Sequence, residues 1–193
     1  AFRADCRRWF EANVPSQPLP SHNTREGFSA HVEWEKQLFA ARWAVVSWPE
    51  AYGGREATLM EWLIFEEEYY RAGAPARVTQ NGIFLLAPTL FEFGTAEQKD
   101  RILRPMAAGE VLWAQAWSEP GAGSDLASLQ MKCADKGDHW LVSGQKIWTS
   151  GADEADWCFA LVRTDTSRKQ GGISFLLIDM RSPGIEARPI VLI

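Results

Sequence analysis

The first 110 residues carry apolar side chains at helical spacing, interrupted by short segments rich in glycine and proline. Between Thr24 and Val45 the apolar positions recur every three or four residues, as one face of an amphipathic helix requires. This pattern ends at Trp48-Pro49, and residues 49–54 have the composition of a loop. The same spacing predicts three more helices, over about residues 58–71, 79–93 and 95–108.

Local signals support the ends of these helices. Gly73 and Pro75 predict the end of the second helix, because neither residue continues a helix readily. Gly94 is placed to serve as the C′ residue of the third. Thr95 and Gln98 have the spacing of a capping box, which predicts the start of the fourth.

After Gly109 the pattern changes to alternation, with β-branched and aromatic residues that are typical of strands. A turn at Lys136-Gly137-Asp138 predicts a hairpin, and residues 164–172 predict an exposed loop. The predicted strands are Val111–Ser118, Leu129–Asp135, His139–Ser143, Lys146–Thr149, Trp157–Arg163, Ile173–Asp179 and Ile185–Ile190.

The order of elements predicts an α+β fold. An N-terminal all-helical domain, residues 1–110, is followed by an antiparallel β-barrel-like domain, residues 111–193. Because strand-like sequence continues to the last residue, we expect this β-domain to be incomplete at its C-terminal end.

Composition narrows the class of protein. Hydrophobic residues make up 46% and charged residues 23% of 193 residues, as in ordinary globular proteins. A net charge of -5 argues against a nucleic-acid partner. The three cysteines are too scattered for a disulfide framework or zinc site, which favours a reducing compartment. No apolar run is long enough for a membrane span and no signal-peptide pattern opens the chain, so a cytoplasmic location is expected.

The run WAQAWSEPGAGSD, residues 113–125, has the chemistry needed to approach a large polar ligand. Gly121 and Gly123 carry no side chain, so the main chain there can bend and come close to a cofactor. The run lacks the third glycine of a dinucleotide fingerprint and the lysine of a P-loop. Taken alone, the run is better explained as a simple β-turn.

A second run, GQKIWTSG at residues 144–151, supplies an aromatic plate and two hydroxyl groups. A hydroxyl of Ser118 or Ser150 that donates to a flavin ring nitrogen would make the ring more electrophilic. The alternatives are that each serine satisfies nearby backbone and that Trp148 belongs to the core. Together, the two runs indicate a flavin site.

Other candidate groups are given no chemical role. The acidic run Glu66–Glu68 lies on a predicted helix, where consecutive residues point in different directions, so a solvated face is expected. His22, His31 and His139 have no metal-like spacing, and no Ser/His/Asp order suggests a nucleophile. The sequence therefore predicts neither a catalytic residue nor a metal site in this chain.

At these two runs the chain resembles the flavin-dependent acyl-CoA dehydrogenase family. GTAEQKDRILRPMAAGE is similar to the helix that leads into the family's β-domain, and WPEAYGG looks like its N-terminal loop. ADWCFALVRTD and GISFLLIDM look like its later strands. The resemblance implies three domains, namely N-terminal helices, a central β-barrel and a C-terminal four-helix bundle, with FAD between the β-domain and the bundle.

The resemblance also implies which residues line the flavin. Ser118 would hydrogen-bond the ring, although the family often has threonine where Ser118 and Ser150 stand. Ser124 would lie at the turn where cofactor and acyl-CoA substrate meet. The implied cofactor-binding residues are Gln115, Trp117, Ser118, Gly123, Ser124, Trp148, Thr149 and Ser150.

The implied reaction is FAD-dependent α,β-dehydrogenation of an acyl-CoA thioester, with an electron-transferring flavoprotein as acceptor and a homo- or hetero-oligomer (dimer or tetramer) as the assembly. The family's catalytic carboxylate lies in the C-terminal bundle, and no residue here matches it. We therefore expect a part of a longer enzyme that is inactive alone. The open alternatives are a non-catalytic partner subunit of a heteromeric dehydrogenase, a same-fold acyl-CoA oxidase or flavin monooxygenase, and a binding module without flavin.

Overall fold

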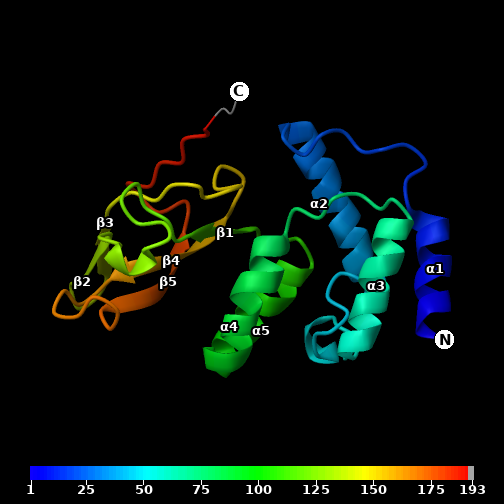
Figure 1. Ribbon diagram of the computed structural model, residues 1–193, viewed down its shortest axis with the longest axis horizontal. Helices are drawn as coiled ribbons and strands as arrows, with labels where there is room; N and C mark the ends of the chain where they lie inside the picture. Colours follow the sequence, from blue (N-terminus) through cyan, green and yellow to red (C-terminus); the bar gives the residue numbers. More distant parts are fainter. Residues whose placement is uncertain (191–193) are drawn as a thin grey trace. The chain divides into compact units, whose positions relative to one another are not determined.

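The computed structural model describes residues 1–190, and the chain divides into two compact units, residues 1–110 and residues 111–193 (Figure 1). The last three residues of the expected β-domain, 191–193, lie outside the described part. The helical elements are α1 (Phe2–Asn13), α2 (Arg25–Ala40), η1 (Glu50–Tyr52), α3 (Leu59–Arg71), η2 (Asn81–Leu86), α4 (Ala87–Phe93) and α5 (Ala96–Ala107). The second unit contains β1 (Trp113–Ala116), η3 (Leu126–Ser128), β2 (Lys132–Asp135), β3 (Trp140–Ser143), β4 (Trp157–Arg163) and β5 (Ile173–Asp179).

The predicted order, helices followed by a sheet, is confirmed. Within residues 1–190, no helix combines the length and apolar character needed to cross a bilayer. Helix α5 begins with the predicted capping box, in which Thr95 accepts from the Gln98 amide and Gln98 accepts from the Thr95 amide.

The core of the helical unit is aromatic and is built where α1 packs on α3. Phe10 lies 5.8 Å from Phe65 and 5.3 Å from Tyr69, measured between ring centroids. Sequence analysis did not single out α1 as a helix. It buries only Cys6 and Phe10, so its apolar signal is short.

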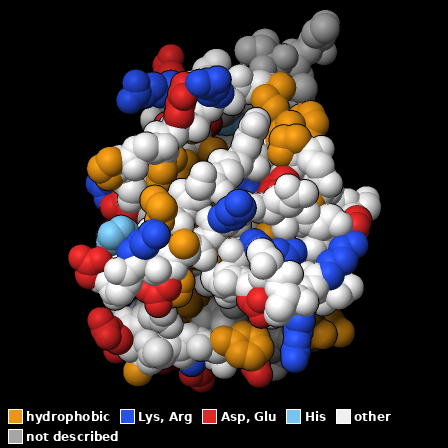
Figure 2. All heavy atoms as spheres, turned by 90° about the vertical axis from the view of Figure 1, so that its left-hand side faces the viewer, with side chains coloured by type: hydrophobic (Ala, Val, Ile, Leu, Met, Phe, Trp, Pro, Cys, Tyr) orange, Lys and Arg blue, Asp and Glu red, His pale blue; other side chains and the backbone are white. Residues whose placement is uncertain are grey.

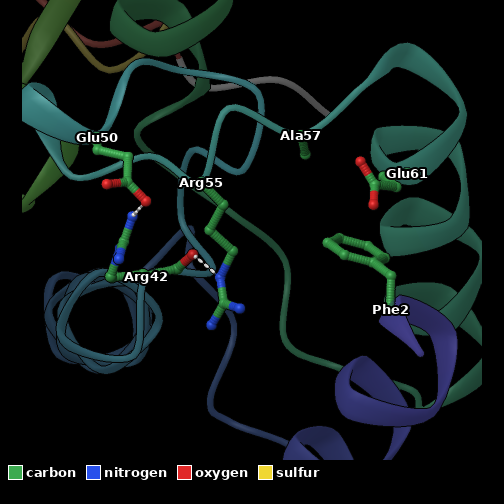
Figure 3. Close-up of a pocket in the computed structure, with 6 residues that line it drawn as sticks. All are labelled: Phe2, Arg42, Glu50, Arg55, Ala57 and Glu61. Carbon is green, nitrogen blue, oxygen red and sulfur yellow. Dashed lines mark hydrogen bonds and ion pairs between the residues drawn. The ribbon is translucent and has the colours of Figure 1, made fainter.

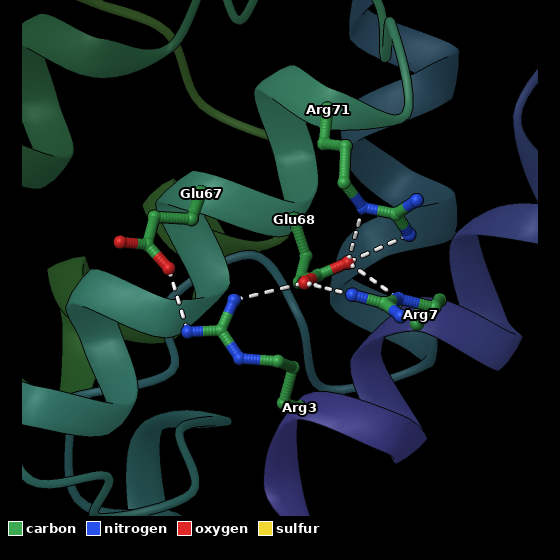
Figure 4. Close-up of polar contacts among 5 residues, drawn as sticks. All are labelled: Arg3, Arg7, Glu67, Glu68 and Arg71. Atoms are coloured by element: carbon green, nitrogen blue, oxygen red, sulfur yellow. Dashed lines mark hydrogen bonds and ion pairs between the residues drawn. The ribbon is translucent and has the colours of Figure 1, made fainter.

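An ion-pair cluster joins the same two helices (Figure 4). The Glu68 carboxylate of α3 is 1% exposed and accepts from Arg3 at 2.9 Å, Arg7 at 2.9 Å and Arg71 at 2.7 Å. The prediction of a solvated acidic face is therefore wrong for Glu68. The reason is that α1 covers this turn of α3 and brings two arginines to it.

The Glu68→Gln protein is expected to lose less stability than the wild-type protein when the pH falls from 7 to 3. Hydrogen bonds from Arg7, Arg3 and Arg71 outweigh burial and hold the pKa of the Glu68 carboxyl far below its ordinary value. The folded state therefore binds this proton less readily. The stabilisation is fully present above the unfolded carboxyl's pKa of about 4.3 and is lost as pH falls below it.

Urea unfolding at pH 7 and pH 3 measures this effect. At pH 7 the Glu68→Gln protein is expected to be about 2 kcal/mol less stable than wild type, and the gap should narrow at pH 3. Glu67→Gln is the control, because Glu67 is 52% exposed and forms an ion pair with Arg3 alone among the described residues. A gap that stays constant between the two pH values would contradict the assignment.

Three features of the predicted helices differ from the structure. Helix α2 stops at Ala40 rather than Val45, because Arg42 adopts a left-handed conformation with φ of 62°. The Trp43 amide then donates to the Leu38 carbonyl at 2.7 Å, closing a Schellman motif. The predicted helix over residues 79–93 is divided into the π-helix η2 and α4. Gly94 is an extended C-cap (φ −71°) rather than a left-handed C′ residue.

The sheet of the second unit is centred on β4. Strand β5 pairs antiparallel with β4 over all seven residues, so β1 and β2 share the other edge of β4. The core beneath consists of small residues: Ala114, Ala116, Cys133, Cys158, Ala160 and Val162. On the face shown in Figure 2, acidic and basic side chains are interspersed with separate hydrophobic groups.

This sheet differs from the predicted antiparallel barrel in two respects. Among the described residues it is open, with order β1-β4-β2-β3, and β1 runs parallel to β4. The predicted strands over residues 146–149 and 185–190 are not strands. Residues 144–150 instead form a loop that lies beside the segment after β1, and residues 185–190 are exposed coil.

Candidate functional site

The structure brings together the two runs that sequence analysis singled out. The Ile147 amide donates to the Ser118 carbonyl at 2.9 Å, and the Lys146 ammonium donates to the Trp117 carbonyl at 2.9 Å. Trp117 and Ser118 directly follow β1, whereas Lys146 and Ile147 lie in the loop after β3. Residues nearly thirty positions apart therefore lie side by side at this end of β1.

A tight turn follows the first of these segments. Glu119 and Ala122 exchange two backbone hydrogen bonds, of 2.9 Å and 3.0 Å, with Pro120 and Gly121 at the tip. A Cβ added at Gly121 or Gly123 would meet no described atom within 4 Å, and neither residue has a left-handed φ. Packing and conformation within the described chain therefore give no reason for these glycines, and the space beside them is open.

The second segment holds an exposed indole in an unusual conformation. Trp148 is 66% exposed and has a φ of 61°, a left-handed value that costs a bulky residue roughly 1–2 kcal/mol. The Ser150 amide donates back to the Trp148 carbonyl at 3.1 Å and helps to hold this turn. Strained backbone of this kind concentrates at functional sites.

Two buried polar atoms of the joined segments have no hydrogen-bond partner among the described residues. They are Thr149 Oγ1 and Trp117 Nε1, each on one of the two joined segments. An unsatisfied buried donor costs about 1–3 kcal/mol. Both atoms are thus suited to a ligand that carries hydrogen-bond acceptors.

Gln115 and Ser124 are not linked to this centre in the same way. Gln115 lies within β1 and pairs with Phe159 of β4. Ser124 is exposed and precedes Asp125, which pairs with Lys169 at 2.8 Å. Within residues 1–190 no hydrogen bond connects either residue to the turn at Trp148.

Sequence analysis missed the two charged residues at the junction. The Glu119 carboxylate accepts from the Gln130 amide at 2.6 Å, the Met131 amide at 2.9 Å and Lys146 at 2.9 Å. Burial raises the pKa of the Glu119 carboxyl, but these hydrogen bonds outweigh it and bring the pKa below its ordinary value. Burial lowers the pKa of the Lys146 ammonium. The available signal was that Lys146 is the only charged residue in GQKIWTSG.

A separate hollow in the helical unit has a structural explanation (Figure 3). It encloses about 260 Å³ and is lined by Phe2, Arg42, Glu50, Arg55, Ala57 and Glu61. Its arginines are already used: one pairs with Glu50, and the other caps the carbonyls of residues 41 and 42 at the end of α2. None of the predicted flavin residues lines it.

Comparisons with known proteins agree over nearly all of the chain. A family model described as "Acyl-CoA dehydrogenase, N-terminal domain" matches residues 1–110, and one described as "Acyl-CoA dehydrogenase, middle domain" matches residues 114–191. "Acyl-CoA dehydrogenase IpdE1" of Mycobacterium tuberculosis is 41% identical over 200 residues, covering 98% of this chain and 51% of that protein. The chain thus spans about half the length of the curated relatives it matches.

Solved structures show the same relationship. "Tcur3481-Tcur3483 steroid ACAD" is similar with a TM-score of 0.81 and 32% identity, over 97% of this chain and 49% of that chain. The "ChsE4-ChsE5 complex from Mycobacterium tuberculosis" is similar with a TM-score of 0.77 and 36% identity, over 93% of this chain and 46% of that chain.

Proposed function

The chain belongs to the acyl-CoA dehydrogenase family, and we propose that it carries part of the FAD and substrate site of an enzyme that dehydrogenates an acyl-CoA thioester. Members of this family are flavoproteins of lipid metabolism. The observation that carries the proposal is the junction between Trp117-Ser118 and Lys146-Ile147, with buried donors left open on both sides of it.

The residues at this junction fit a flavin. Trp148 offers an exposed aromatic surface, and Thr149 Oγ1 and Trp117 Nε1 are buried donors that a ring system with acceptor atoms would satisfy. The open space at Gly121 and Gly123 suits a close approach of backbone to ligand. Bound FAD supplies the acceptor for the hydride that leaves the β carbon of the acyl group.

The remaining predicted residues take supporting roles in this proposal. The hydroxyls of Ser118 and Ser150 would donate hydrogen bonds to the ring and make it more electrophilic. Gln115 would line the flavin from β1. Gly123 and Ser124 directly follow the turn at Pro120-Gly121 and would lie where the cofactor and the acyl-CoA meet.

No described residue is assigned to removal of the α proton. Glu119 is the carboxylate nearest the junction by contact, but both of its oxygens accept hydrogen bonds from within the chain, and its pKa is lowered. A general base needs a free carboxylate oxygen within reach of the proton it takes. We therefore propose that the base comes from outside the described residues, which leaves these residues inactive alone.

The proposed assembly is an oligomer of two kinds of chain in the cytoplasm. An electron-transferring flavoprotein would reoxidise its flavin. Two of the similar structures carry the names of two proteins, Tcur3481-Tcur3483 and ChsE4-ChsE5. This observation also favours a second candidate function, that of a partner subunit that contributes only part of a shared site. The description "steroid ACAD" makes a steroid-linked acyl-CoA the first substrate class to test.

The flavin site is tested with the double variant Trp148→Ala/Ser150→Ala. It removes the exposed indole and one donor, and we expect the FAD dissociation constant to rise about tenfold, which corresponds to about 1.4 kcal/mol. Fluorescence titration of the apoprotein with FAD measures this constant, and the flavin absorbance of the purified protein shows the accompanying loss of bound FAD.

Trp140→Ala is the matched control, because Trp140 of β3 is also exposed, at 52%, but lies outside the two runs. It should retain the wild-type flavin content. If the double variant also retains that content, the flavin assignment is wrong.

A further inference from the structure

We propose that the buried ion pair between Glu119 and Lys146 is the positioning element of the flavin site, and this inference rests on the proposed function. The pair holds the segment that carries Trp117 and Ser118 against the segment that carries Trp148. In this role it sets the spacing between the two sides of the flavin ring without touching the reacting atoms.

Both members of the pair are almost fully withdrawn from solvent. The Lys146 side chain is 7% exposed and that of Glu119 is 9% exposed, with 2.9 Å between the ammonium and the nearer carboxylate oxygen. Isolated charges buried to this extent are unfavourable, whereas a paired and hydrogen-bonded arrangement is tolerated and fixes a specific geometry. The sites of both charges are therefore defined by their mutual contact.

The pair connects three separate parts of the β unit. Glu119 binds the backbone amides of Gln130 and Met131, which precede β2, while Lys146 binds the Trp117 carbonyl after β1. One backbone hydrogen bond, from Ile147 to the Ser118 carbonyl, is the other bond that joins these runs within the described chain. Loss of the Lys146 ammonium removes both its bond to Glu119 and its bond to the Trp117 carbonyl, which would leave this single backbone bond between the runs.

The position of the pair in the sequence gives it direct leverage on the candidate flavin residues. Glu119 follows Ser118 immediately, and Lys146 stands two residues before Trp148. Because Trp148 already has a strained left-handed backbone, its conformation depends on neighbours that fix it on both sides. A displacement of Lys146 would reach Trp148 through Ile147 alone.

The contacts of Glu119 and Lys146 distinguish positioning from catalysis. Glu119 accepts three hydrogen bonds and Lys146 donates two, all to atoms of this chain. Groups engaged in this way have structural partners rather than a ligand. Their effect on the flavin must therefore act through the residues they hold.

Lys146→Met in the holoprotein tests the proposal, because methionine keeps most of the apolar stem and removes the charge. The FAD dissociation constant of the apoprotein, measured by flavin fluorescence titration, is expected to rise at least tenfold. The flavin absorption bands should shift, while far-UV circular dichroism stays that of wild type. Lys146→Arg keeps a cation and should recover part of the lost affinity.

The control is Arg77→Met, which removes the buried cation of another ion pair, Arg77–Glu66, in the helical unit, where Glu66 is partly buried. It should lower the melting temperature but leave the FAD dissociation constant within twofold of wild type. A Lys146→Met protein that loses only thermal stability, as this control does, would overturn the proposal.

If Lys146→Met does not fold, Glu119→Asp carries the test, since it keeps the charge and retracts the carboxylate by one methylene group. A raised FAD dissociation constant supports the proposal, and a wild-type constant overturns it. A wild-type protein that binds no FAD at all would overturn the proposed function, and this inference with it.

Discussion

Gly54→Ala is expected to destabilise the helical unit by about 3 kcal/mol. A Cβ at Gly54 would lie 1.9 Å from the Trp48 carbonyl oxygen, a backbone atom that no side-chain rotation can move. The loop must therefore shift. It would then weaken the bonds from the Arg42 guanidinium to the Gly54 carbonyl and from the Arg55 amide to the Val46 carbonyl.

Urea unfolding followed by tryptophan fluorescence measures the loss, because Trp43 and Trp48 are buried beside this loop. Gly73→Ala is the control. Gly73 has a left-handed φ of 66° but no atom within 4 Å of an added Cβ, so only backbone strain of about 1 kcal/mol is expected. Equal stability of the two variants would show that the loop around Gly54 yields easily.

The sequence predicted best those elements whose signal and contacts are local. Strands β4 and β5 have the predicted bounds, because each is a nearly continuous apolar run and the two runs pair with each other over the full length. The capping box at Thr95 was likewise readable, since both of its partners lie within one helical turn. In these cases the residues that carry the pattern also make the contact.

Features that depend on distant partners were not readable. The apolar residues after Ala40 continue the helical spacing but are buried in a turn, because Arg42 ends the helix and Arg55 caps it from the next loop. Glu68 resembled a surface residue until α1 supplied two of its arginines. The burial of the residues after Ala40 and the burial of Glu68 are therefore not specified by their neighbours in the sequence.

The candidate site shows the same division. The composition of the two runs indicated a ligand, and a turn at Gly121 was expected and is present. Residues 146–149, however, were predicted as a strand from their pattern but form a loop. Lys146 and Ile147 of this loop bond to the carbonyls of Trp117 and Ser118 instead of joining a strand ladder. The ion pair that joins the runs could not be inferred, because each charge is explained only by its partner.

Gly123→Val is expected to reduce FAD affinity on the order of a hundredfold, about 2.7 kcal/mol, with little change in stability. The backbone at Gly123 is not left-handed, and an added Cβ meets no described atom within 4 Å. The free energy of unfolding should therefore change by no more than about 0.5 kcal/mol. The loss falls on the ligand, because the valine side chain fills the space through which backbone and cofactor approach each other.

Parallel measurements of urea unfolding and FAD titration separate these two effects, with Ala187→Val as the control that adds bulk to exposed coil of the same unit. A variant that keeps FAD but no longer binds acyl-CoA would restrict Gly123 to the substrate side of the turn. A variant that keeps both ligands would contradict the assignment. The open space beside Gly123 would then no longer indicate a ligand, because neither FAD nor acyl-CoA would require a glycine at this position.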